Sequence, residues 1–123
     1  MKTSDKTILE KIHKEALSID RIIEGYDLNS FINDEKTEKA VCMTIINIGE
    51  HIKHISPELI EENDHISWKD ISGLRNVTAH GYDTLRMEDV YTYTTKDIPE
   101  FRKQIEEILE KEKTATAPKP STL

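Results

Sequence analysis

Apolar residues recur at every third or fourth position along most of this 123-residue chain, and this spacing constrains the fold more than any other feature. An α-helix completes a turn in about 3.6 residues, so side chains at this spacing lie on one face of a helix. The longest regular seam predicts a helix that begins near Ser30 or Asp34 and continues to about residue 55, with a core-facing stripe formed by Val41, Ile45, Ile48, Ile52 and Ile55.

The N-terminal segment shows the same spacing. Ser4 can cap a helix that runs to about Glu24, because its hydroxyl can accept a hydrogen bond from a backbone N–H of the first turn. Gly25 is suited to end this helix, since glycine readily adopts the left-handed backbone that often follows a last turn. The predicted inward stripe consists of Ile8, Ile12, Ala16, Ile19 and Ile23.

Three helical segments are predicted in the second half of the chain. A short turn begins at Ser56, which can cap it and is followed by a proline. Residues 67–70 have the spacing of a capping box and open a helix that ends near Gly81. A last helical region covers residues 87–111 and should kink just before Pro99, because proline has no backbone N–H to donate.

These segments predict an all-α fold, an up-and-down bundle of four or five helices in one domain that covers residues 1–112. The chain contains four glycines and four prolines, so few positions interrupt the helical pattern. Residues 113–123 contain almost no side chain that a core would bury, and we expect a flexible C-terminal tail there.

Cysteine content and hydropathy predict a cytoplasmic protein. Cys42 is the single cysteine, so the chain cannot form an internal disulfide, and its apolar neighbours favour a buried, unreactive thiol. No apolar run approaches the ~20 residues that cross a bilayer. The polar N-terminus leads directly into an amphipathic pattern and lacks the apolar core of a signal peptide.

The charge balance limits the kind of nucleic-acid site that the chain can carry. Lys and Arg total 17 against 24 Asp and Glu, which gives a net charge of −7. A broad electrostatic grip on nucleic acid normally requires a basic face, and this balance argues against one. A small local basic site remains compatible with it.

Residues 75–82, with the sequence RNVTAHGY, combine the groups that phosphodiester cleavage needs. Arg75 offers a planar fork of donors that fits phosphate oxygens, and Asn76 beside it adds an amide. His80 can take or give a proton near pH 7. Spacing alone also fits a structural interpretation, in which Arg75 forms an ion pair and His80 lies near a helix end.

Two other groups of side chains have the chemistry of a binding site. Glu50, His51 and His54 resemble a set of metal ligands, but two histidines one turn apart more often lie on a solvated helix face, and we expect no metal and no cofactor. Tyr91 and Tyr93 have the chemistry of a platform for stacking bases. Packing of half-exposed rings explains them more simply.

The motif resembles the Arg-x4-His-x-Tyr signature of the HepT-like proteins, a branch of the HEPN domains. The resemblance extends to Ile48-Gly49-Glu50, which is similar to the family's Ile-Gly-Glu element. Trp68, which precedes Ile71 and the motif, is similar to the segment at the start of the family's catalytic helix. Residues 97–101 are similar to the segment that opens the family's last helix.

This resemblance implies a dimeric, metal-independent ribonuclease toxin whose catalytic residues are Arg75 and His80, meeting at a dimer cleft. His80 would act as general base on a ribose 2′-hydroxyl, with Asn76 supporting the phosphate. The expected partners are RNA, a second copy of the chain and an MNT-type nucleotidyltransferase antitoxin that attaches AMP to Tyr82. The predicted dimer surface on the second helix consists of Ala40, Met43, Ile46 and Gly49.

Two alternatives remain open from the sequence. The chain could be a non-catalytic subunit of a nucleotidyltransferase, with the same cleft binding a nucleotide or substrate for its partner. It could also be a helical interaction module in which the motif is vestigial. RNA cleavage in EDTA that disappears when His80 is replaced separates the ribonuclease from both.

Overall fold

The computed structural model describes the backbone of residues 1–80 and 86–116, and the side chains of residues 1–75 and 86–114. Every regular element within these residues is helical, as the apolar spacing predicts. In chain order the elements are α1 (Thr3–Ile22), α2 (Leu28–Ile32), α3 (Glu35–Ile52), α4 (Pro57–Glu62), α5 (Trp68–His80), α6 (Met87–Thr92), the π-helical turn η1 (Tyr93–Asp97) and α7 (Ile98–Thr116).

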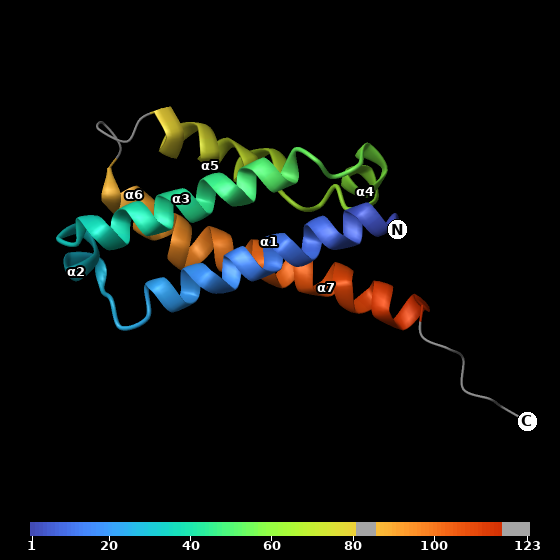
Figure 1. The fold of residues 1–123 in the computed structure, drawn as a ribbon, viewed down its shortest axis with the longest axis horizontal. Coiled ribbons are helices and arrows are strands. Elements are labelled where there is room, and N and C mark those ends of the chain that lie inside the picture. Colours follow the sequence, from blue (N-terminus) through green and yellow to red (C-terminus); the bar gives the residue numbers. More distant parts are fainter. Residues whose placement is uncertain (81–85, 117–123) are drawn as a thin grey trace, which may run out of the picture.

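The long helices form a bundle in which α3 packs against α5 on one side and against α1 on the other (Figure 1). Helix α1 also packs along α7. The short helices α2 and α4 lie at opposite ends of the bundle, and α1 begins and α7 ends near α4 (Figure 1). The all-α bundle that the sequence predicts is therefore confirmed. No described helix is long and apolar enough to cross a membrane.

The first helix begins earlier than its sequence suggests. Lys2 occupies the N-cap position with an extended backbone and no side-chain cap, so the prediction that Ser4 caps the helix is wrong. Asp5 lies in the first turn, where a negatively charged side chain interacts favourably with the positive end of the helix dipole. Its buried carboxylate also accepts hydrogen bonds from the Ser56 backbone N–H (2.9 Å) and hydroxyl (2.6 Å), which attaches this turn to the start of α4.

Helix α1 ends at Ile22, two residues before the predicted end near Glu24, and Gly25 lies in the turn that follows. Gly25 has a φ of +80°, the left-handed backbone that glycine adopts without steric cost. The single helix predicted next is divided into α2 and α3. Asp27 and Ser30 form a capping box that begins α2. Asp34 accepts a hydrogen bond from the Thr37 N–H (3.1 Å), which begins α3. The sequence proposed Ser30 and Asp34 as alternative starts of one helix, whereas each belongs to a separate one.

The core runs through all the long helices. The predicted α3 seam is buried along its length, and on α5 Ile71 is buried as expected. Trp68 packs its ring edge-on against Phe101 of α7, with ring centroids 5.7 Å apart, and donates its indole N–H to the Asn63 carbonyl (2.9 Å). These contacts fix the first turn of α5 relative to α4 and α7, and so position the helix that carries the motif.

The predicted kink before Pro99 takes the form of the π-helical turn η1, which ends at Asp97. In a regular α-helix the residue at position 99 would donate to the Thr95 carbonyl, which proline cannot do. A local change of helical period accommodates this loss and lets α7 begin at Ile98. Helix α7 continues to Thr116, past the domain end placed at residue 112, and residues 117–123 lie outside the described part of the chain.

Cys42 is buried in α3 with 3% of its surface exposed. Burial, and to a smaller degree the charge of Glu38, raises the pKa of its thiol to about 11. The thiolate is the nucleophilic form of cysteine, so this side chain is unreactive at neutral pH, as the sequence predicts.

Candidate active site

Helix α5 contains the first six residues of the motif, from Arg75 to His80. The backbone of Asn76 and His80 is helical, but their side chains are outside the described part of the structure, as is all of Tyr82. The motif therefore lies on the predicted helix, near its C-terminal end. Whether the side chains of Arg75, Asn76, His80 and Tyr82 act together stays a prediction.

Arg75 is the motif residue whose surroundings are described, and Glu50 of α3 is its ionic partner. The Arg75 Nε–H donates to Glu50 Oε1, and the exposed fractions of the two side chains are 23% and 46%. Lys53 Nζ lies 3.6 Å from the same carboxylate oxygen. The Glu50 carboxylate thus lies beside two cations, one from α5 and one from just after the end of α3.

The same contacts keep the Glu50 carboxylate ionised. The hydrogen bond from Arg75 lowers the pKa of Glu50, and the positive charges of Arg75 and Lys53 lower it further. Arginine stays protonated at any physiological pH. The ion pair between Glu50 and Arg75 is therefore intact at neutral pH.

Gly49 explains how Arg75 comes so close to α3. A Cβ atom at Gly49 would lie 2.6 Å from the Cβ, 3.1 Å from the Cδ and 3.3 Å from the Cγ of Arg75. The aliphatic stem of Arg75 thus lies directly across this glycine. The sequence predicts close approach of another helix at Gly49, and the structure identifies α5 of the same chain as that helix. The assignment of Gly49 to the dimer surface is therefore wrong, because Arg75 already covers it.

Sequence reasoning did not find the pairing of Glu50 with Arg75. It considered Glu50 as a metal ligand with His51 and His54 instead. His54 is exposed and His51 half-buried, and no group of three or more metal-ligating side chains occurs among the described residues. Gly49, the residue before Glu50, indicates in the sequence that another helix comes close to α3 at this point. Sequence spacing does not say which residue of that helix lies opposite Glu50.

The outer face of α3 retains apolar surface near this site. Met43 is 58% exposed, Ala40 is exposed and Ile46 is half-buried. Seven helical steps place Met43 and Glu50 within about 20° of each other around the helix axis. The exposed apolar surface and the Glu50–Arg75 pair therefore lie on the same side of α3.

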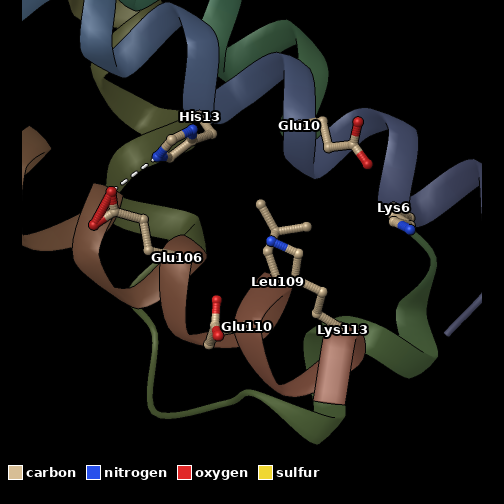
Figure 2. A pocket seen from close by; sticks show the side chains of 7 residues that line it. All are labelled: Lys6, Glu10, His13, Glu106, Leu109, Glu110 and Lys113. Atoms are coloured by element: carbon tan, nitrogen blue, oxygen red, sulfur yellow. Dashed lines mark hydrogen bonds and ion pairs between the residues drawn. The ribbon is translucent and has the colours of Figure 1, made fainter. Parts of the chain in front are cut away.

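A groove between α1 and α7 is separate from this site. Its volume is about 510 Å³, and His13 Nε2 lies 2.9 Å from Glu106 Oε2 across it, within hydrogen-bonding distance (Figure 2). The groove contains no residue of α5, and its charged side chains are of both signs. Figure 2 shows the lining residues, which are Lys6, Glu10, His13, Glu106, Leu109, Glu110 and Lys113.

Comparison with known proteins identifies the class of the molecule. The "Ribonuclease HepT-like" family matches residues 12–108, so this chain belongs to the HepT-like ribonuclease family, a branch of the HEPN domains. The match includes α3 and α5 and hence Glu50 and the motif through Tyr82.

Individual relatives agree with the family assignment. A protein of Caldanaerobacter subterraneus subsp. tengcongensis named as a candidate RNase is 32% identical over 92% of this chain and all of its own length. A candidate RNase of Methanocaldococcus jannaschii is 28% identical over 82% of this chain and 93% of its own. A probable ribonuclease HepT of Thermococcus cleftensis is 26% identical over 88% of this chain and 98% of its own length. No solved structure matches the chain significantly.

The contact at Gly49 predicts opposite effects for two glycine-to-alanine substitutions. Gly73→Ala, in α5, adds a Cβ that meets nothing within 4 Å, so it should stabilise the protein by about 0.5–1 kcal/mol through helix propensity. Gly49→Ala gains the same propensity but must separate α3 from α5, and overpacking of this kind costs about 1–3 kcal/mol. Urea unfolding of both variants at one protein concentration measures the difference. A Gly49→Ala protein as stable as Gly73→Ala would contradict the close approach.

Proposed function

We propose that this chain is a metal-independent endoribonuclease and the toxin of a toxin–antitoxin pair. Membership of the HepT-like ribonuclease family supports RNA as its substrate. The observation that carries the proposal is the placement of Arg75, which α3 holds through Gly49 and Glu50 on the helix that also contains His80. An arginine and a histidine are the two groups that cleavage by an internal ribose hydroxyl needs.

The proposed reaction is a transesterification within the RNA. His80 removes the proton of a ribose 2′-hydroxyl, and the oxygen attacks the adjacent phosphorus. Arg75 holds the scissile phosphate and stabilises the charge that develops on its oxygens, with Asn76 as a supporting donor. The bond from phosphorus to the 5′-oxygen breaks as the new bond forms, and the departing oxygen takes a proton from solvent, to which His80 returns the proton that it removed. The products are a 2′,3′-cyclic phosphate and a free 5′-hydroxyl. Because the RNA supplies its own nucleophile, no metal-activated water is required.

A two-fold dimer would complete this site. On one helix, five steps separate Arg75 and His80 by about 140° around the axis, so a single α5 does not direct both toward one point. The exposed Met43 lies on the side of α3 that carries the Arg75 ion pair, and the exposed Ala40 is about 80° from Glu50 around the helix axis. Burial of this surface against a second copy would bring the Arg75 side chains of two copies closer together, and two arginines in one cleft would favour RNA on a chain of net charge −7.

The proposed antitoxin is an MNT-type nucleotidyltransferase that acts on Tyr82. The tyrosine hydroxyl would attack the α-phosphate of ATP and release pyrophosphate, which leaves AMP on the ring. Tyr82 is two residues from His80 in the sequence. A phosphodiester at this position would repel the RNA phosphate and obstruct its approach to Arg75.

The catalytic proposal predicts that His80→Ala and Arg75→Ala each remove most RNA cleavage by pure protein in EDTA. Loss of a general base costs ~10²–10⁴-fold, which sets the scale for His80. Arg75→Lys should also fail, because an ammonium keeps the charge but not the planar fork. Gel analysis of a labelled RNA measures cleavage, and circular dichroism confirms the helical fold.

His54→Ala is the matched control, since His54 is an exposed histidine near the end of α3 and should cleave as the wild type does. Undiminished cleavage by His80→Ala would contradict the mechanism. A wild-type protein that cleaves no RNA, but is required by a nucleotidyltransferase for activity, would favour the non-catalytic subunit instead.

The dimer proposal predicts that Met43→Lys weakens both self-association and cleavage, because a charge would replace a large apolar side chain that is 58% exposed on α3. Met43→Leu keeps the apolar surface and should behave as the wild type does. Sedimentation velocity at micromolar concentration measures association, and the same samples are assayed for cleavage. A strictly monomeric protein that cuts RNA at the wild-type rate would rule out the shared cleft.

The control proposal predicts that Tyr82→Phe stays active but escapes neutralisation by the co-expressed nucleotidyltransferase, because it lacks the hydroxyl that accepts AMP. Tyr93→Phe, which changes a tyrosine of η1, should remain neutralised. Mass spectrometry of the peptide that contains Tyr82 measures the modification. If this peptide gains no adenylate while the toxin is neutralised, control proceeds by binding alone.

A further inference from the structure

Two neighbouring residues of α3 hold the Arg75 side chain at two separate points. Its aliphatic stem lies across Gly49, where the missing Cβ makes room for it. Its Nε–H is bonded to the carboxylate of Glu50, the next residue. Consecutive helical residues point about 100° apart, so the stem and the head of Arg75 are fixed from different directions.

This ion pair contributes little to the stability of the fold. The Glu50 side chain is 46% exposed, and the attraction between exposed charges is offset by hydration and by the entropy of ordering long side chains. Its main physical effect is therefore on orientation. A bond to Nε restricts rotation at the end of the side chain and so fixes the plane of the guanidinium.

Orientation has a direct value for an arginine that binds a reacting phosphate. Stabilisation of developing charge depends on donors that are already aimed at the oxygens, and a displacement of ~1 Å can cost ~10²-fold in rate. The carboxylate also has a cost, because its negative charge repels the same phosphate. Lys53, 3.6 Å from the Glu50 oxygen, offsets part of that repulsion.

We propose that Glu50 is a positioning residue for Arg75, which improves turnover of RNA at some expense of RNA binding. This inference rests on the proposed ribonuclease function. Glu50 does not touch the RNA and transfers no proton. It acts by holding the guanidinium in the orientation that stabilises the charge on the scissile phosphate.

The test separates turnover from binding in the full-length protein. Glu50→Gln keeps the shape of the side chain but removes its charge, and it should lower kcat about 10- to 100-fold without raising KM for RNA. Glu50→Asp retains the charge on a shorter stem and should recover part of kcat. Glu35→Gln is the matched control, because Glu35 is also on α3 and forms an exposed ion pair, with Lys39 at 2.8 Å. It should change neither constant.

A loss of stability alone would reduce the active fraction of the destabilised variant and leave KM unchanged, so urea unfolding accompanies the kinetics. A Glu50→Gln protein that is folded and retains the wild-type kcat would overturn the proposal. So would a higher KM with an unchanged kcat, because that pattern indicates the loss of a contact that binds RNA equally in the ground state and the transition state.

A second measurement examines the contact without RNA. The Nε–Hε resonance of Arg75, assigned by its absence in Arg75→Lys, should shift in Glu50→Gln and stay in place in Glu35→Gln. If the resonance shifts as expected but the wild-type protein cleaves no RNA, the proposed function is wrong although the contact exists. If the resonance does not shift, Glu50 does not hold Arg75 and the positioning role is wrong even in an active ribonuclease.

Discussion

The candidate site depends on the contact between α3 and α5 at Gly49. Any larger residue would place its Cβ within 2.6 Å of Arg75 Cβ, so the two helices approach this closely only because the side chain is absent. Helix-interior glycine costs about 1 kcal/mol relative to alanine, and here that cost permits a specific packing. The contact brings Glu50 within reach of Nε and leaves Arg75 partly exposed at the surface. The fold thereby determines the position of the arginine before any ligand is present.

Most of the fold follows from local patterns that operate within one or two helical turns. The apolar seam from Val41 to Ile55 predicts α3. Gly25 predicts the turn after α1, and Ser56 predicts the start of α4. These predictions succeed because backbone preference and capping involve only nearby residues. Ser4 is not the cap, because α1 begins at Thr3 and Ser4 lies inside its first turn. The bonds between Asp5 of that turn and Ser56, a residue distant in sequence, are tertiary contacts that a local pattern does not indicate.

The candidate site was predictable to a smaller extent. Arg75 and His80 could be selected because their chemistry and spacing resemble a ribonuclease signature. The family comparison shows the ribonuclease family, and the catalytic role of the two residues stays a prediction. The role of Glu50 could not be selected, since it depends on the register in which α5 packs against α3. One step of rotation in either helix would move the carboxylate away from Nε. Register is set by the whole set of core contacts, including Trp68 against Phe101 far from the motif.

The acidic composition also has a consequence for how this site would select its ligand. With a net charge of −7, most of the surface repels nucleic acid, so attraction must come from the few positions where cations outnumber carboxylates. Arg75 and Lys53, beside Glu50, are the cations described at the candidate site. Two cations in a negative field attract a phosphate chain weakly unless a second pair lies beside them. The same electrostatic balance that disfavours non-specific binding therefore favours an arrangement in which a second copy supplies the rest of the charge.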